Sequence, residues 1–477
     1  MGACHVSAAP AAGRVRAASV VGLIAIATMP FVILRLKLVP VDDADAFWHV
    51  LSGQNVWRTH DVVVDDPFGR FSTNTWVQLD WLSDLVMAGL HAVGGFPALA
   101  WLYASLGVLL FAALYALARS RSGVLVAGFV AVASWIGTFA SQAVRPQTIS
   151  FVLLAITLFV WLRVARRPGR DPWWLIGLTW VWACSHGLWF LGPLVGFVVV
   201  AGMALDRSRP RANLLRLLAV PVGGVAVAAL TPVGPTLLRM PFTVNAYARF
   251  VTEWRPPDVH EPYVAATAGL LALTVLGWAR GGRRVPWTDV LLWGMALGWT
   301  LLYARTVALG AVIVAPLAAG ALEGLLAPPV DRAAARLERW LVPASMVVAI
   351  TLAAFLAPSF AARPGGVPLA LGAAIDRLPD GTVMLNDDAL GGWLLLEHPR
   401  VSPVIDTRTY LFDIPYIEDY IEARGAVGDW PEFVSRTGAR AALVRQGGAL
   451  ETALPETLGW QVVAQADGYV LLVDPSA

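Results

Sequence analysis

Apolar stretches long enough to cross a membrane recur along this chain, and they constrain its fold more than any other feature. A helix needs roughly 20 apolar residues to span a hydrocarbon layer of about 30 Å. Because lipid offers no hydrogen bonds to an exposed backbone, each crossing is expected to be helical. Since hydrophobic residues make up 57% of the 477 positions and charged residues 14%, the chain is expected to be an integral membrane protein. Clear spans lie at 17–38, 97–118, 123–141, 148–165, 213–231, 263–279, 287–303, 306–326 and 340–360.

The apolar segment 173–205 differs from these spans, because at about 1.5 Å per residue it is too long for one crossing and short for two. Ser185-His186-Gly187 interrupts it near the middle. Arginine clusters flank it on both sides, at Arg163, Arg166, Arg167 and Arg170, and at Arg207, Arg209, Arg211 and Arg216. Because basic residues concentrate in cytoplasmic loops, both flanks are expected inside. The segment is then predicted to form a hairpin of two short or tilted helices, with His186 at the outer turn.

With this hairpin the sequence predicts eleven crossings, a cytoplasmic N-terminus and an extracytoplasmic C-terminus. The first run follows Arg14 and Arg16 and has no cleavage pattern after it, so a retained helix is expected rather than a signal peptide. Cys4 and Cys184 are the only cysteines, so neither a disulfide framework nor a cysteine metal site is expected. The net charge of +2 gives no reason to expect a nucleic-acid partner.

The composition changes after Pro358, where the apolar spans end. Residues 1–361 are predicted to form the transmembrane domain, with a large first outer loop at 39–81. Residues 362–477 are predicted to form an extracytoplasmic soluble α/β domain, which at about 110 residues can bury a core of its own. Short β-like runs alternate there with helical ones, with Pro and Gly at their boundaries. These runs are 382–386, 390–397, 401–406, 414–423, 430–436 and 441–445, with a closing pair at 460–465 and 469–473.

The first outer loop is rich in acids and aromatic residues in a chain that has few charges elsewhere. A predicted helix over 44–58 begins at Asp43-x-Asp45 and continues into Trp48-His49. Two carboxylates at this spacing can share a divalent cation, or one can act as a general base while the other orients it. The alternative is that acids at a helix start only satisfy its first amides. Asp66-Pro67 is typical of a turn. Trp76 and Trp81, beside Asp80, are either interface aromatics or platforms for a sugar ring.

Further polar residues lie at the outer ends of later spans. Arg145, in Arg145-Pro146-Gln147, and Arg305 suit phosphate, because a guanidinium forks onto anionic oxygens. Their alternative roles are snorkelling to the interface or bonding between helices. His186 is either functional or hydrogen-bonded to a neighbouring helix. Glu253 is a further outer acid.

In the C-terminal domain, Asp406-Thr407-Arg408 follows a predicted strand. The ends of strands in α/β units are frequent ligand sites. An Asp/Arg pair that closes a loop is an equally open interpretation.

Together these motifs resemble a bacterial polytopic family that is similar to the GT-C glycosyltransferases. The shared features are the first-loop run from Asp43 to Gly53, the residues around Asp66 and Asp80, and motifs at five later positions. These are Arg145-Pro146-Gln147, Trp182 with His186-Gly187, Pro232-x-Gly234 with Glu253-Trp254, Tyr303-Ala304-Arg305 and Asp406-x-Arg408. Three positions depart from the family pattern. Phe47 stands where a Trp is usual, Ser185 replaces an Asn, and Asp80 stands where Glu is commoner.

The resemblance implies a hexosyl- or pentosyltransferase of a bacterial plasma membrane that takes its sugar from a polyprenyl phosphate. The acceptor would be a glycan, a lipid or a protein. A first-loop Asp, here Asp43 or Asp45, would be the catalytic carboxylate or would hold a divalent cation such as Mg²⁺ or Mn²⁺. Arg145 and Arg305 would bind the phosphate. The remaining candidate substrate-binding residues are Trp48, His49, Asp80, Gln147, His186, Glu253 and Arg408.

Two other classes of protein remain as alternatives. A transporter or flippase for a lipid-linked intermediate would use the same Arg and His residues, but would favour polar residues at mid-bilayer and an internal repeat. The sequence shows neither, since its polar residues collect at one outer face. A non-catalytic assembly scaffold that displays the C-terminal domain would leave the acidic loop unexplained.

Overall fold

The computed structural model describes residues 9–167, 169–282, 284–326 and 332–476. Cys4 lies outside these residues. The chain is mainly helical and divides into two compact units, which are described separately below. The first unit consists of Met1–Val39, Ala100–Thr231 and Val251–Phe360. The second consists of Pro40–Leu99, Pro232–Phe250 and Ala361–Ala477.

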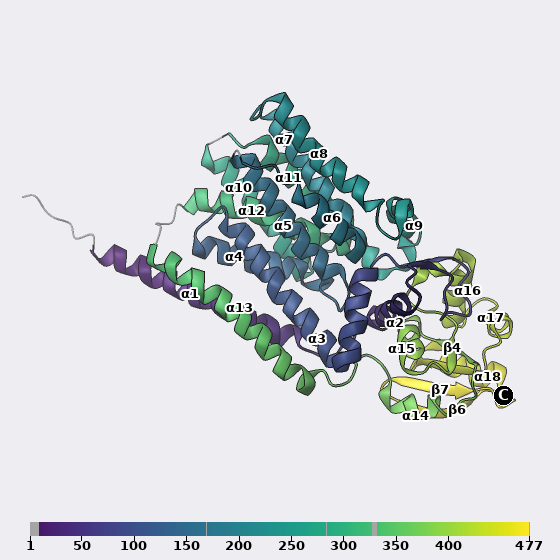
Figure 1. Ribbon diagram of the computed structural model, residues 1–477. Coiled ribbons are helices and arrows are strands. Elements are labelled where there is room, and N and C mark those ends of the chain that lie inside the picture. Colours follow the sequence, from purple (N-terminus) through teal and green to yellow (C-terminus); the bar gives the residue numbers. More distant parts are fainter. Residues whose placement is uncertain (1–8, 168, 283, 327–331, 477) are drawn as a thin grey trace, which may run out of the picture. The chain divides into compact units, whose positions relative to one another are not determined.

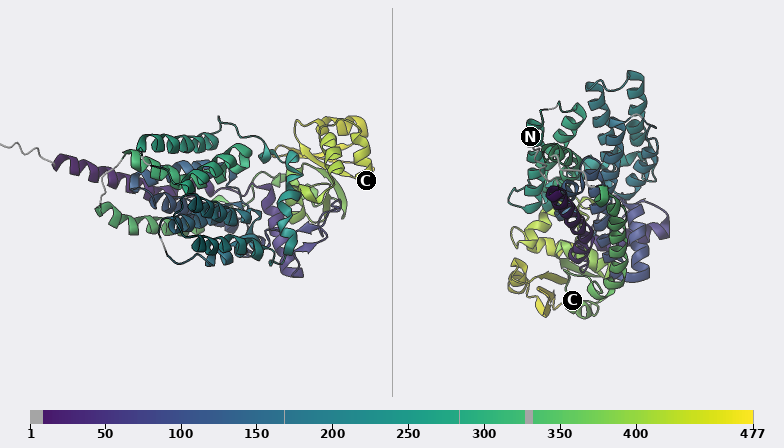
Figure 2. Two further views of the ribbon diagram at one scale, coloured as in Figure 1. Left: turned by 90° about the horizontal axis from the view of Figure 1, so that it is seen from above. Right: turned by 90° about the vertical axis from the view of Figure 1, so that its left-hand side faces the viewer.

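The first unit is a bundle of long helices that run alongside one another (Figures 1 and 2). Among the described residues, nine helices are long and apolar enough to cross a membrane. The chain is a multi-pass membrane protein. The helices of this unit are α1 (Ala9–Lys37), the later part of α3 (Trp81–Arg119), α4 (Val124–Thr138), α5 (Gln147–Arg166), α6 (Trp174–Ser185), α7 (Leu191–Leu205), α8 (Arg211–Ala228), α10 (Pro262–Gly281), α11 (Trp287–Leu302), α12 (Val307–Leu326) and α13 (Arg332–Phe360).

Helix α12 lies at the centre of this bundle, against α4, α10 and α11. Its sequence is almost entirely Ala, Gly, Val, Leu and Ile, and nearly every side chain from Val307 to Leu322 is buried. Small residues let the neighbouring backbones approach closely. A Cβ added at Gly310 would lie 2.8 Å from the carbonyl oxygen of Ala296 on α11. A membrane helix that is apolar on all sides is therefore surrounded by protein here.

The predicted hairpin at 173–205 is confirmed. His186 has an extended backbone between α6 and a short 3₁₀ turn, Gly187–Phe190, which leads into α7. The guanidinium of Arg209, after α7, donates to the carbonyl oxygen of Val164 at the end of α5 over 2.7 Å. The guanidinium of Arg216, at the start of α8, pairs with Asp171, which precedes α6. The segment therefore leaves one end of the bundle and returns to it.

Two of the predicted crossings are short helices, and a third is part of a longer one. α6 has 12 residues and α11 has 16. The span predicted at 97–118 is the second part of α3, which begins at Trp81 and has 39 residues. Gly95 breaks the helical geometry of α3 with φ 58° and ψ −151°, a conformation that glycine adopts readily. The sequence did not reveal the first part of α3, because Gly94-Gly95 and Pro97 indicate a helix start.

The second unit combines the first outer loop with the C-terminal α/β region. Its N-terminal part holds helix α2 (Ala44–Thr59), the antiparallel pair β1 (Val63–Val64) and β2 (Trp76–Val77), and the first part of α3. The short helix α9 (Met240–Asn245) also belongs to it. The C-terminal part contains β3 (Thr382–Asn386), α15 (Asp388–Glu397), β4 (Val401–Pro403), α16 (Ile414–Arg424), α17 (Trp430–Thr437), β5 (Ala441–Arg445), α18 (Ala449–Leu458), β6 (Gln461–Ala466) and β7 (Tyr469–Val473), after α14 (Gly372–Ile375).

The strands β3 to β7 form one mixed sheet in the order β4-β3-β5-β7-β6, as Figure 1 shows in part. β3 pairs in parallel with β4 and β5, whereas β5, β7 and β6 pair antiparallel. The predicted strands 382–386, 441–445 and 469–473 are observed with the same bounds.

The first outer loop contributes to the hydrophobic core of the C-terminal sheet. Trp76 of β2 is 1% exposed and packs in the same cluster as Leu385 of β3 and Phe433 of α17. The backbone N–H groups of Thr73 and Asn74 donate to the carbonyl oxygen of Leu411 over 2.9 and 3.0 Å. The loop and the C-terminal region therefore share one core.

Candidate active site

The acidic start of α2 is the first part of the candidate site. Asp43 is the N-cap of this helix, and its Oδ1 accepts from the backbone N–H of Asp45 over 3.0 Å. Asp43 thus has the structural role that was the alternative to chemistry. Helix α2 ends at Thr59, and the C-cap residue His60 adopts a left-handed backbone conformation with φ 61°. The helix predicted over 44–58 is confirmed.

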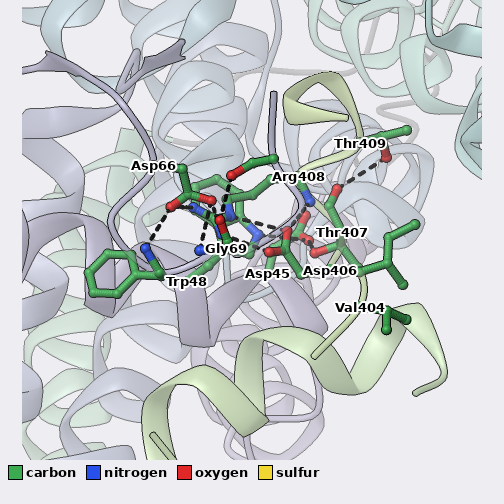
Figure 3. A network of polar contacts seen from close by, with 12 residues as sticks. Asp45, Trp48, Asp66, Gly69, Val404, Asp406, Thr407, Arg408 and Thr409 are labelled. Carbon is green, nitrogen blue, oxygen red and sulfur yellow. Dashed lines mark hydrogen bonds and ion pairs between the residues drawn. The ribbon is translucent and has the colours of Figure 1, made fainter. Parts of the chain in front are cut away.

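The carboxylate of Asp45 is bound by two donors. Its Oδ1 accepts from the indole Nε1 of Trp48 over 3.1 Å, one turn along the same helix. The same oxygen accepts from the hydroxyl of Thr407 over 2.5 Å (Figure 3). Asp45 and Trp48 are half-buried, whereas Asp43 is buried. Of the two predicted catalytic acids, Asp45 therefore has the more accessible side chain.

Arg408 lies at the centre of a buried ion cluster beside this carboxylate (Figure 3). Its guanidinium donates to both oxygens of Asp66 over 3.0 Å each, and to Oδ2 of Asp406 over 2.7 Å. Its guanidinium carbon also lies 4.5 Å from the centre of the Trp76 ring. Burial alone lowers the pKa of Arg408, but the Asp406 and Asp66 carboxylates outweigh it and raise the pKa above its ordinary value. The arginine therefore stays charged inside the unit.

Asp66 also forms the turn that its sequence predicts. Its two carboxylate oxygens accept from the backbone N–H groups of Phe68 and Gly69, each over 3.1 Å. A short acidic side chain that bonds its own backbone in this way stabilises a turn. The same carboxylate therefore both shapes the first loop and binds Arg408.

A second buried polar group joins α2 to α3. Nδ1 of His49 lies 2.7 Å from Oδ1 of Asp84, and the two side chains are 2% and 1% exposed. The hydroxyl of Ser52 lies 2.5 Å from the other oxygen of Asp84. Burial alone lowers the pKa of His49, but the carboxylate of Asp84, with smaller contributions from Asp80 and Asp45, raises the pKa above its ordinary value. The acids around His49 thus favour its charged form.

The first unit brings together three other predicted residues. The carboxylate of Glu253 lies between two guanidinium groups, 3.0 Å from Nη1 of Arg145 and 3.4 Å from Nη1 of Arg305. All three side chains are partly exposed. The hydroxyl of Ser141 donates to the backbone oxygen of Arg305 over 3.3 Å. Two cations around one carboxylate form a group that can bind anionic oxygens.

The other predicted residues of the first unit are buried. Nδ1 of His186 lies 2.9 Å from the hydroxyl of Ser150 on α5. The same hydroxyl oxygen accepts from the indole N–H of Trp182 over 2.7 Å. His186 is 7% exposed. This geometry is that of a histidine bonded to a neighbouring helix, the structural alternative of the sequence analysis. Gln147 begins α5 and is 4% exposed.

Three residues of the second unit contribute to the candidate site although the sequence did not indicate them. Thr407 lies between the candidate residues Asp406 and Arg408, but nothing in the sequence indicated that its hydroxyl contacts Asp45. Asp84 and Ser52 were not considered, although an acid in the first turn of a long apolar helix is a usable signal. A carboxylate in such a position needs a partner, and here the partner is His49.

Comparison with solved structures identifies the fold. Neither a protein-family model nor a curated protein matches the sequence. The oligosaccharyltransferase of Archaeoglobus fulgidus in its apo form has a TM-score of 0.57 at 13% identity, over 90% of this chain and 69% of that chain. ArnT from Cupriavidus metallidurans in the apo state has a TM-score of 0.53 at 14% identity, over 96% of this chain and 98% of that chain. Both are GT-C glycosyltransferases. The chain has the GT-C fold. The resemblance seen in the sequence is therefore confirmed at the level of the fold.

The first-loop acids are the candidate ligands for a divalent cation. Among residues 9–167, 169–282, 284–326 and 332–476, no group of three or more His, Cys, Asp or Glu could hold a metal ion. Mg²⁺ is often bound by one or two carboxylates together with substrate phosphates. Asp43 and Asp45 fit a cation only in this shared form, in which the substrate supplies further oxygens. The metal stays a prediction.

Proposed function

We propose that this protein is a membrane glycosyltransferase that moves a sugar from a polyprenyl phosphate to an extracytoplasmic acceptor. The observation that carries the proposal is the carboxylate of Asp45, which two donors orient at the start of α2 in a chain with the GT-C fold. Support also comes from two related structures. ArnT from Cupriavidus metallidurans has been solved with undecaprenyl phosphate, and the Archaeoglobus oligosaccharyltransferase with a tethered acceptor peptide.

In this proposal Asp45 is the general base. It takes the proton of an acceptor hydroxyl while the hydroxyl oxygen attacks the anomeric carbon of the sugar. The bond between this carbon and the phosphate oxygen breaks, and the electron pair leaves with the polyprenyl phosphate. Such a single displacement inverts the configuration at the anomeric carbon. Asp43 is assigned to the helix cap, because its Oδ1 already accepts the N–H of Asp45.

Arg145 and Arg305 are proposed to bind the phosphate of the lipid carrier. Guanidinium groups stabilise the negative charge that grows on the leaving oxygen. Glu253 forms ion pairs with both arginines, so an incoming phosphate would compete with its carboxylate. The Trp48 indole, Asp80 and Gln147 remain proposed substrate-binding residues, and Asp43 and Asp45 remain the proposed ligands of a divalent cation.

The test is sugar transfer by the full chain in proteoliposomes, with a panel of undecaprenyl-phosphate hexoses and pentoses as donors. Asp45→Asn is expected to lower the rate about 100- to 10,000-fold, the usual contribution of a general base. Asp43→Asn preserves the helix cap, because Asn caps a helix as well as Asp does. It is expected to retain most of the activity.

Asp42→Asn is the matched control, because Asp42 is an exposed acid of the same loop. It is expected to match the wild type. Normal transfer by Asp45→Asn would rule out the mechanism. Movement of a labelled lipid phosphate across the bilayer without sugar transfer would favour the transporter instead.

A further inference from the structure

The residues that orient Asp45 come from two distant parts of the chain. Trp48 belongs to the same helix, whereas Thr407 is 362 positions away in the segment that follows β4. A carboxylate in the first turn of a helix can rotate about its side-chain bonds. Two donors on one oxygen restrict that rotation and set the direction of the second oxygen, Oδ2.

Thr407 lies between two anchored residues. On one side the Oδ1 of Asp406 accepts from the backbone N–H of Arg408 over 2.8 Å. On the other side the guanidinium of Arg408 binds Asp66 of the first loop. Asp406 and Arg408 are 3% and 2% exposed. The backbone that carries the Thr407 hydroxyl is therefore fixed to the loop that carries Asp45.

Helix α15 sets the spacing between the same two elements. A Cβ added at Gly392 would lie 3.0 Å from the carbonyl oxygen of Ala44 in α2. A Cβ added at the preceding residue, Gly391, would lie 2.3 Å from the carbonyl oxygen of Ile405 and 2.6 Å from Cβ of Asp406. Two adjacent glycines thus allow α15 to contact both the start of α2 and the segment before Thr407. Larger residues would move these segments apart.

From this geometry we propose that Thr407 is a positioning residue, which orients the Asp45 carboxylate for proton transfer from the acceptor. The inference rests on the proposed role of Asp45 as the base. The C-terminal region then belongs to the catalytic apparatus, because the hydroxyl of Thr407 orients the carboxylate of Asp45 in the first loop. Arg408, predicted from the sequence to bind substrate, is assigned to anchoring this hydroxyl, since its guanidinium is buried between two carboxylates.

The test compares Thr407→Val with Thr407→Ser in the full chain, with the same donors in proteoliposomes. Valine has the shape of threonine without the hydroxyl, whereas serine retains it. Thr407→Val is expected to lower kcat about 10- to 100-fold with KM within about twofold, since misorientation of a reacting group affects the transition state. Thr407→Ser is expected to restore at least about half of the wild-type kcat.

A double-mutant comparison separates positioning from a general loss of structure. If Thr407 acts through Asp45, adding Thr407→Val to Asp45→Asn is expected to cause no further loss of kcat. Gly392→Ala offers a second route, because it shifts α2 without removing a polar group, and it is expected to lower kcat severalfold. This variant also keeps the test open should Thr407→Val fail to fold.

The outcomes are distinguishable. Wild-type kcat in Thr407→Val, together with a large loss in Asp45→Asn, would overturn the positioning role and leave the proposed function intact. Equal losses in Thr407→Val and Thr407→Ser would also overturn it, because the hydroxyl would not be the cause. A rise in KM with unchanged kcat would make Thr407 a substrate contact instead. Normal transfer by Asp45→Asn would overturn both proposals.

Discussion

His49 shows how single residues organise the charge of the second unit. Its side chain is buried, and the acidic groups that face it are Asp84, Asp80 and Asp45. A buried carboxylate without a partner is costly, and the imidazole of His49 supplies a partner for Asp84. The histidine thereby stabilises a contact between α2 and α3, one turn along α2 from the carboxylate proposed as the base. This role differs from the substrate-binding role predicted for His49 from the sequence.

The raised pKa of His49 makes the stability of the protein depend on pH. Because the folded state binds this proton more tightly than the unfolded state, the stabilisation is fully present below the ordinary pKa of 6.5. It is lost as the pH rises through the raised pKa of the folded state. The thermal midpoint of the purified full chain is therefore expected to decrease as the pH rises above about 6.5.

His49→Gln is expected to remove that part of the pH dependence. His260→Gln, which changes an exposed histidine, serves as the control and is expected to leave it unchanged. The same decline in the midpoint for wild type and His49→Gln would contradict the argument.

At the scale of elements, close packing of small residues determines how α10 and α12 meet. A Cβ at Gly277 on α10 would lie 2.8 Å from both the Cβ and the carbonyl oxygen of Ala321 on α12. Gly269, two turns earlier on the same helix, has open space at that position. The two glycines therefore allow a matched comparison of packing within one helix.

Gly277→Ala is expected to destabilise the protein by about 1 to 3 kcal/mol, because a backbone oxygen cannot move aside easily. Gly269→Ala is expected to be neutral or slightly stabilising, since alanine favours a helix by about 1 kcal/mol over glycine. The measurement is the thermal midpoint of both variants in the same detergent. Equal midpoints would mean that α12 can shift to accept the methyl group.

The sequence predicted elements better than contacts, for physical reasons that particular residues illustrate. Membrane-length apolar runs and short apolar runs bounded by Pro or Gly are local patterns, so α12 and the strands β3, β5 and β7 were predicted without knowledge of their contacts. Arginines on both flanks of 173–205 predicted the hairpin, because the concentration of basic residues in cytoplasmic loops depends on charge and not on packing. The first part of α3 was missed, since Gly95 can end a helix or lie in a kink and only tertiary packing decides between them.

The candidate site was predictable in its residue types but not in its connections. Asp45 stood out because acids are rare beside lipid, and Arg145 with Arg305 because they oppose the trend of basic residues toward the cytoplasm. The bond from Thr407 to Asp45 joins positions 362 apart, so no local pattern could reveal it. The same is true of Arg408 and Asp66, which lie 342 positions apart.

At the scale of the whole molecule, two distant parts of the chain meet at the buried guanidinium of Arg408 in the second unit. The side chain of Arg408 is 1% exposed and lies between Asp66 of the first loop and Asp406 of the C-terminal region. Removing one partner of a buried ion pair leaves the other charge uncompensated, which costs about 3 to 5 kcal/mol. The first loop and the C-terminal region are therefore expected to lose stability together.

Arg408→Met tests this coupling in the full chain, because methionine fills much of the same volume without charge. Its thermal midpoint is expected to fall, and protease cleavage within 61–75 is expected to increase together with cleavage of the C-terminal region. Arg249→Met is the matched control, since Arg249 pairs with Glu418 in the same unit but both side chains are about half exposed. An exposed pair contributes about 0 to 1 kcal/mol, so this variant is expected to resemble the wild type. Increased cleavage of the loop with an unchanged C-terminal region would show that the two parts are stabilised independently.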